Sequence, residues 1–250
     1  MSGHSKWAQI KRQKGAADAK RGQVFTKLGR ELSVAAREGG PDPSGNPRLR
    51  LAIQRARENN MPMENIERAI KKGSERNEGA GLEEIVYEGY GPGGAAIMVE
   101  ALTDNRNRAA AEIRNVFTRA GASLGETGCV AWLFDQRGVL SVELGDKLDA
   151  DQVALEAIDS GADDVAISDG TLEIYTEPAN MEKVRQHLDQ KRVPVASAEI
   201  SRIAKTDLQL DEKEALSVLR LLDKLEEMDD VQRVYTNVHF SPEVVRKYQG

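Results

Sequence analysis

The sequence predicts an α+β protein with an N-terminal three-helix bundle, followed by two α/β domains of which one is inserted in the other. Three observations predict this fold class. Apolar residues recur at helical spacing up to about residue 73, and strand-like and helical segments alternate beyond residue 82. The segment from 138 to about 206 then has the βαββαβ order of a ferredoxin-like domain, which we expect to be the inserted one.

Three helices are expected in the first part of the chain. The first spans about 17–38, where apolar residues line one side and two glycines and a proline follow. Asn46 is placed as the N-cap of the second helix, with Pro47 at its first position. Pro62 opens the third helix, and Gly73 is expected to end it. These helices predict one small bundle, and the polar stretch 74–81 reads as a linker.

Strand patterns begin after residue 82. The segments 84–90 and 95–102 are strand-like, and between them Pro92 and Gly93 suit the central positions of a type II turn. Asp104 is expected to cap the helix that follows. A third strand is predicted at 130–134. The ferredoxin-like pattern then contributes six elements: strand 139–144, helix 150–160, strand 165–168, strand 171–176, helix 179–190 and strand 195–203.

One more helix and one more strand complete the chain. They are predicted at 211–228, with Asp211 and Glu214 as a capping box, and at 231–240. Because a lone helix and strand cannot bury their apolar faces, we expect them to return to the unit that begins at residue 82. The expected domains are therefore the following: 1–76, a basic arm and helical bundle; 82–136 with 205–240, a discontinuous α/β domain; 137–204, the inserted domain.

The charge of the chain is divided unevenly along its length. Residues 1–76 hold 17 Lys and Arg against 8 Asp and Glu, whereas residues 77–250 hold 18 against 33. The first 30 residues contain a single acid, Asp18, and eight cations: Lys6, Lys11, Arg12, Lys14, Lys20, Arg21, Lys27 and Arg30. Such an asymmetry indicates a polyanionic partner at the basic end.

The segment 2–15 has no helical apolar periodicity and carries Trp7 among its cations. A basic arm with an aromatic side chain can neutralise phosphates and stack on a base or a sugar, so we expect it to bind nucleic acid. The alternative is a solvated tail that Trp7 anchors to the bundle.

A second basic cluster comprises Arg106, Arg108, Arg114 and Arg119. Arg106 and Arg108 fall in the first turn of a predicted helix, where the helix dipole disfavours cations. Local pairing of Arg108 with Asp104 and Glu112 would offset that cost. Contact with a nucleic-acid phosphate is the alternative, and both interpretations stay open here.

Catalytic and metal-binding patterns are weak. Gly89–Gly94 precedes a strand and lacks the lysine of a phosphate-binding loop, so we interpret it as a hairpin turn. The three histidines are too scattered for a metal cluster. Turn or surface positions explain the acid pairs at 163–164, 226–227 and 229–230. We therefore expect no catalysis, no cofactor and no metal.

Cys129 is the only cysteine, so no intramolecular disulfide can form, and we interpret it as a buried structural thiol. No apolar run approaches the roughly 18 residues of a membrane span, and the basic start lacks the apolar core of a secretory signal. The expectation is a soluble, cytoplasmic protein without a membrane partner.

Several motifs resemble those of the YebC/PmpR family. In chain order they are GHSKW at 3–7, NPRL at 46–49, NNMP at 59–62, YEGYGPGG at 87–94, TDNRNR at 103–108 and GADDV at 161–165. The resemblance spans the whole chain. It implies three domains, a cytoplasmic bacterial protein and a probable DNA-binding transcriptional regulator.

The same family includes a mitochondrial activator of translation, and bacterial members have been linked to ribosomes stalled on proline-rich sequence. The resemblance therefore also allows an RNA- or ribosome-associated role in translation. No short turn in the sequence presents an obvious DNA-recognition helix, and a basic arm suits structured RNA as well as DNA. A third alternative is a module that binds proteins or small molecules through the acidic α/β domains.

Overall fold

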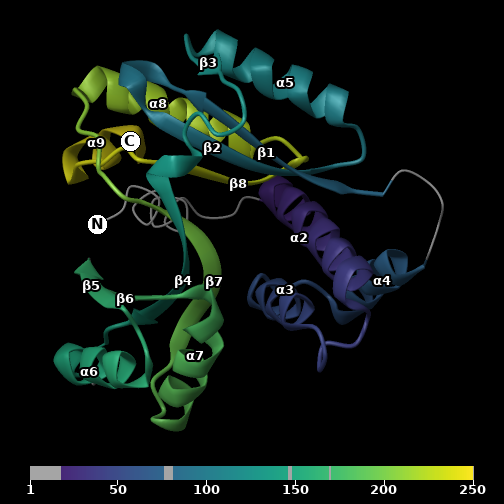
Figure 1. Ribbon diagram of the computed structural model, residues 1–250, viewed down its shortest axis with the longest axis vertical. Coiled ribbons are helices and arrows are strands. Elements are labelled where there is room, and N and C mark those ends of the chain that lie inside the picture. Colours follow the sequence, from purple (N-terminus) through teal and green to yellow (C-terminus); the bar gives the residue numbers. More distant parts are fainter. Residues whose placement is uncertain (1–17, 76–80, 146–147, 169, 250) are drawn as a thin grey trace. The chain divides into compact units, whose positions relative to one another are not determined.

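The computed structural model describes residues 18–75, 81–145, 148–168 and 170–249, and they form two compact units (Figure 1). One unit is Phe134–Ile203, and the other contains the chain on either side of it. The predicted fold class is confirmed, because a helical region is followed by two sheets of four strands each. In the described ranges, no helix is both long and apolar enough to cross a membrane.

Three helices form the bundle: α2 (Asp18–Gly39), α3 (Pro47–Glu58) and α4 (Met63–Ser74). Asn46 caps α3 as predicted, since its Oδ1 accepts a hydrogen bond from the Leu49 backbone N–H at 3.0 Å. The buried core of the bundle is aliphatic: Leu28, Leu32, Ala35, Ala36, Leu49, Ala52, Ala56, Met61 and Ile66.

Gly73 is the second-last residue of α4, so the helix ends one residue later than predicted, and the glycine does not have the positive φ of a C-terminal cap. A Cβ atom at this position would overlap the backbone carbonyl oxygen of Ser33 on α2. The Ser33 hydroxyl also donates to the Ala69 carbonyl oxygen of α4 at 2.8 Å. The glycine is therefore needed because two helix backbones approach each other closely here.

The first sheet has the strand order β3-β1-β2-β8. Its strands are β1 (Glu83–Tyr90), β2 (Ala96–Thr103), β3 (Ser123–Leu124) and β8 (Val231–Thr236). Because β8 pairs with β2, the segment after residue 204 returns to the sheet that begins at residue 83.

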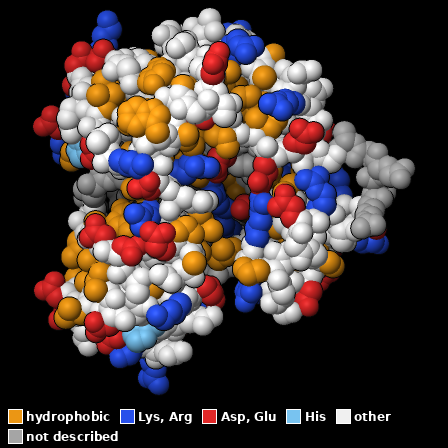
Figure 2. All heavy atoms as spheres, in the orientation of Figure 1, with side chains coloured by type: hydrophobic (Ala, Val, Ile, Leu, Met, Phe, Trp, Pro, Cys, Tyr) orange, Lys and Arg blue, Asp and Glu red, His pale blue; other side chains and the backbone are white. Residues whose placement is uncertain are grey.

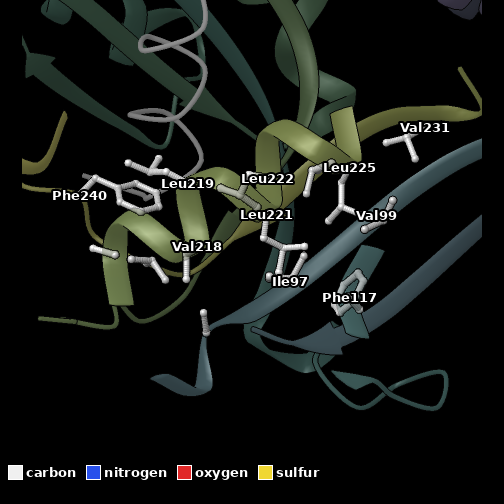
Figure 3. Packing of buried hydrophobic residues seen from close by; sticks show 14 of the residues in the cluster. Ile97, Val99, Phe117, Val218, Leu219, Leu221, Leu222, Leu225, Val231 and Phe240 are labelled. Atoms are coloured by element: carbon white, nitrogen blue, oxygen red, sulfur yellow. The ribbon is translucent and has the colours of Figure 1, made fainter. Parts of the chain in front are cut away.

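Helices α5 (Arg106–Arg119) and α8 (Glu212–Glu226) pack on one face of this sheet. Figure 3 shows Leu221 of α8 beside Ile97 of β2, and Leu225 of α8 beside Val99 of β2. A further helix that the sequence did not predict, α9 (Pro242–Gln249), adds two buried valines to the same core.

The connections of this sheet match the predictions in part. The turn between β1 and β2 agrees with type II, because Gly93 has φ 65° and the Gly94 N–H donates to the Gly91 carbonyl. The predicted strand at 130–134 is wrong, since Ala131–Leu133 is a 3-10 turn and the next strand begins at Phe134.

The second unit has the strand order β5-β6-β4-β7 and contains the predicted βαββαβ series. Its elements are β4 (Phe134–Glu143), α6 (Ala150–Ser160), β5 (Asp164–Ser168), β6 (Thr171–Thr176), α7 (Met181–Gln190) and β7 (Val195–Ala204). The first and third strands of the series are central, as a ferredoxin-like fold requires.

Candidate nucleic-acid interface

The carboxylate of Asp230 joins the bundle to the first sheet. It lies directly before β8, and only 6% of its side chain is exposed. Arg30 of α2 donates to its Oδ1 at 2.5 Å, and Arg108 of α5 donates to its Oδ2 at 2.9 Å. The Thr103 hydroxyl at the end of β2 also donates to Oδ2 at 2.9 Å. Both oxygens of this buried acid are therefore paired.

These contacts set the charge state of the cluster. Burial raises the pKa of Asp230, but the hydrogen bonds from Arg108, Arg30 and Thr103 together outweigh it and hold the pKa below its ordinary value. The hydrogen bonds to Asp230 and Asp104 raise the pKa of Arg108 further above its already high value. The cluster is thus fully charged at neutral pH.

Three side chains on one side of α2 meet the C-terminal end of α8. Gln23 donates to the Glu227 carbonyl at 3.4 Å, Lys27 to the Glu226 carbonyl at 2.5 Å and Arg30 to the Asp229 carbonyl at 2.7 Å. The last carbonyls of a helix have no partner within the helix and carry partial negative charge. Cations on α2 satisfy them, so Lys27 and Arg30 support the packing of the bundle against the sheet domain.

The N-terminal turn of α5 differs from its prediction in two respects. Asn105, not Asp104, is the N-cap, because its Oδ1 accepts from the Arg108 N–H at 3.0 Å. Arg108 pairs with Asp104 at 2.7 Å as expected, but its second partner is Asp230 and not Glu112. Asp230 lies in a turn, which is one of the two positions predicted for it, but it is buried and not at the surface.

Other cations remain available to a ligand. Exposed cations that form no ion pair in the described part of the chain include Arg50 of α3, Lys72 of α4, and Arg106, Arg114 and Arg119 of α5. On the face drawn in Figure 2, described Lys and Arg side chains are interspersed with Asp and Glu side chains. The basic excess of residues 1–76 is therefore not concentrated on this face.

The structure describes the side chains of only some of the predicted contact residues. Lys6, Trp7, Lys11, Arg12 and Lys14 fall outside the described residues. Lys20 and Arg21 belong to the first turn of α2, and their side chains are not among those described. Of the eleven predicted residues, the structure thus places the side chains of Lys27, Arg30, Arg106 and Arg108.

The α3–α4 connection is shorter than the sequence suggested. Only Asn59–Pro62 separates the two helices, which is a length that helix-turn-helix motifs use. However, the first half of α4 exposes Glu64 and Glu67, and its one cation there, Arg68, is paired with Glu64. A recognition helix contacts bases through its N-terminal residues, where these acids would repel phosphates.

No catalytic chemistry is built around the cysteine. Cys129 lies in a turn, and it is half-buried rather than buried as predicted. Burial raises the pKa of its thiol, and the Glu88 carboxylate adds to the effect, so the reactive thiolate is disfavoured. Among the residues that the structure describes, no group of three or more His, Cys, Asp or Glu side chains is arranged to hold a metal ion.

By its architecture the chain is an α+β protein in which a helical N-terminal region is followed by two sheet domains. The model for the TACO1/YebC N-terminal domain matches residues 5–76, and that for the TACO1/YebC second and third domain matches residues 82–238. The chain belongs to the TACO1/YebC family, which confirms the resemblance seen in its motifs.

Individual relatives agree with this assignment. A protein of Dehalococcoides mccartyi is 58% identical over all of this chain and 99% of its own length. A Chloroflexus aggregans protein is 54% identical over the full length of both. Each carries the name "probable transcriptional regulatory protein". The crystal structure of a conserved hypothetical protein from Aquifex aeolicus matches with a TM-score of 0.83 and 47% identity over 90% of this chain and 92% of that one.

Proposed function

We propose that this protein is a cytoplasmic nucleic-acid-binding regulatory protein, and specifically a DNA-binding transcriptional regulator of the YebC/PmpR type. Relatives that match the full chain are named as probable transcriptional regulatory proteins, which supports a regulatory role. The observation that carries the nucleic-acid contact is the charge division, with eight cations and one acid in the first 30 residues.

The described contacts narrow the set of residues that we propose to meet phosphate. Lys27, Arg30 and Arg108 bind carbonyl or carboxylate groups of the chain itself, so we assign them a supporting role. The proposed contact set is Lys6, Trp7, Lys11, Arg12, Lys14, Lys20 and Arg21, with exposed Arg106 as a separate point of contact. Acidic surfaces of the α/β domains away from Arg106 would be repelled by the polyanion and are available to protein partners.

The second candidate is an RNA- or ribosome-associated factor that acts in translation. The acidic N-terminal half of α4 favours it, because Glu64 and Glu67 do not suit insertion into a DNA groove. A basic arm binds phosphates without reading sequence, and structured RNA offers them in the same way.

The test compares two charge reversals of equal size. Lys6→Glu with Lys11→Glu should weaken binding to a DNA duplex, measured by fluorescence anisotropy, by at least tenfold, since each phosphate-contacting cation contributes to affinity. The control is Lys213→Glu with Arg220→Glu, two exposed cations of α8, which should leave affinity nearly unchanged. Equal effects of the two pairs would refute the proposed contact.

The two candidate polyanions are then separated in cell lysate. A short, sequence-selective footprint on DNA supports the transcriptional role. Co-sedimentation with ribosomes that persists after DNA is digested, and that Lys6→Glu with Lys11→Glu abolishes, supports the translational one.

A further inference from the structure

Two aromatic side chains are exposed at one end of the first sheet. Tyr90 is the last residue of β1 and is 38% exposed, and Trp132 lies in the 3-10 turn before β4 and is 65% exposed. Exposing this much apolar surface is unfavourable in water, and an aromatic pair at the surface is typical of a binding site.

The polar atoms of both rings are already bonded. The Tyr90 hydroxyl donates to the Cys129 carbonyl oxygen at 2.9 Å, and the Trp132 Nε1–H donates to the same oxygen at 3.1 Å. One carbonyl thus holds both rings. What remains for a ligand is their π-surface, because neither ring has a free donor to offer.

The turn that carries this carbonyl is held by a buried acid. Glu88 is 4% exposed, and its carboxylate accepts hydrogen bonds from the backbone N–H groups of Gly128, Val130 and Ala131 at 2.7–2.8 Å. Its own carbonyl accepts from the Gly125 N–H at 2.8 Å. Charge-assisted bonds of this kind are strong, so the aromatic pair is fixed before any ligand binds.

Positive charge lies close along the chain. Tyr90 pairs with Ser123 of β3, and α5 ends only four residues earlier at Arg119, an exposed arginine without an ion pair among the described residues. The segment 106–133 contains four arginines against two glutamates, although residues 77–250 as a whole are strongly acidic. The aromatic pair therefore lies next to a locally basic part of an acidic domain.

We propose that Tyr90 and Trp132 form a stacking surface for unpaired bases of single-stranded nucleic acid, with phosphates directed toward Arg119. Stacking needs only π-surface and tolerates any base, which fits rings whose polar atoms are occupied. This inference deepens the proposed function and rests on it: the regulator would contact phosphates through its basic start and a single-stranded segment through this surface.

The test uses the small number of tryptophans. The chain has two, so Trp7→Phe leaves Trp132 as the sole indole fluorophore and retains a ring at position 7. The full-length Trp7→Phe protein is titrated with a 12-nucleotide oligothymidylate, with an oligouridylate of equal length and with an abasic 12-mer of equal charge. Saturable quenching by the strands with bases, and not by the abasic strand, is expected. If the oligothymidylate binds more tightly than the oligouridylate, the ligand is DNA, and the reverse order identifies RNA.

Variants link the signal to the rings. Trp132→Ala and Tyr90→Ala should each weaken single-strand binding about tenfold in anisotropy measurements. Tyr90→Phe keeps the ring and should retain most of the affinity. Leu155→Ala, which truncates another side chain that is 65% exposed, is the control and should change nothing.

The outcomes separate this inference from the proposed function. Equal quenching by the abasic strand, or full single-strand affinity in Trp132→Ala, would overturn the stacking surface even if duplex binding persists. If the native protein binds none of the single strands and no duplex, the proposed function is overturned, and the inference with it.

Discussion

At the scale of single residues, Asp230 connects parts of the chain that are distant in sequence. Its partners Arg30 and Arg108 are 200 and 122 positions away. A buried carboxylate with two arginines is stable only while all members are present, because removal of one leaves charge without compensation. Asp230 thus fixes α2 and α5 to the sheet. It also engages Arg30 and Arg108, so these two arginines are less available to other anions.

Replacing Asp230 by Asn should lower the free energy of unfolding by about 2 kcal/mol. The usual cost of breaking a buried ion pair is about 3–5 kcal/mol, but Arg30 and Arg108 are partly exposed and can be hydrated in the variant. Urea denaturation measures the difference. The control is Asp229→Asn, an exposed acid next to it, which should change stability by less than about 0.5 kcal/mol.

The same pair of proteins has a defined pH dependence. The folded state lowers the pKa of Asp230, so its contribution is present above the unfolded pKa of about 4 and is lost as the pH falls through the folded value. The stability difference between the native protein and Asp230→Asn should therefore shrink below about pH 4. A difference that stays constant or grows on acidification would contradict the charged cluster.

Sequence patterns could not reveal this cluster. An acid pair before a strand is commonly a turn, and nothing local to Asp230 distinguishes it from the exposed Asp229. The arginines at 30 and 108 lie in other elements, and only the tertiary fold brings the three together. Arg108 shows the same limit, since local spacing indicated Asp104 correctly but suggested Glu112 in place of Asp230.

At the scale of elements, periodicity and caps predicted most of the fold. The N-caps Asn46 and Asp211 and the βαββαβ series were found because each depends on neighbouring residues. Two elements were missed for physical reasons. Strand β3 has two residues, which is too short for an alternating pattern. Helix α9 has eight residues, which is too short for a clear helical period. The apolar run at 130–134 suggested a strand, but Glu88 holds the backbone there in a turn.

Gly73→Ala tests the close approach of α2 and α4. The new methyl group would overlap the Ser33 carbonyl, so we expect a loss of about 3 kcal/mol in unfolding free energy, although alanine is the better helix former. Gly22→Ala is the matched control on α2, where a Cβ meets nothing within 4 Å. That variant should gain about 0.5–1 kcal/mol in thermal or urea unfolding. If both glycines respond alike, the helices do not pack as described.

At the scale of the whole molecule, the structure refines the meaning of the charge division. Eight cations in the first 30 residues suggested a salt slope near −7 for duplex binding, if each met a phosphate. Lys27 and Arg30 now have partners within the chain, which leaves six and lowers the expected limit to about −5. The basic end that sequence composition identified thus performs two tasks: it secures the bundle, and we propose that it also binds the polyanion.

The salt dependence of duplex binding tests this account most directly. Four cations ahead of the described residues are changed to Gln together: Lys6, Lys11, Arg12 and Lys14. A control protein carries four such changes at exposed cations elsewhere: Lys183, Lys213, Arg220 and Arg246. Affinity is measured from about 50 to 200 mM salt.

The slope of log K against log salt should become shallower by about 3 to 4 in the first variant, because each lost phosphate contact removes about 0.9. The control should keep the slope of the native protein. An unchanged slope in the first variant would contradict the claim that the basic start binds nucleic acid.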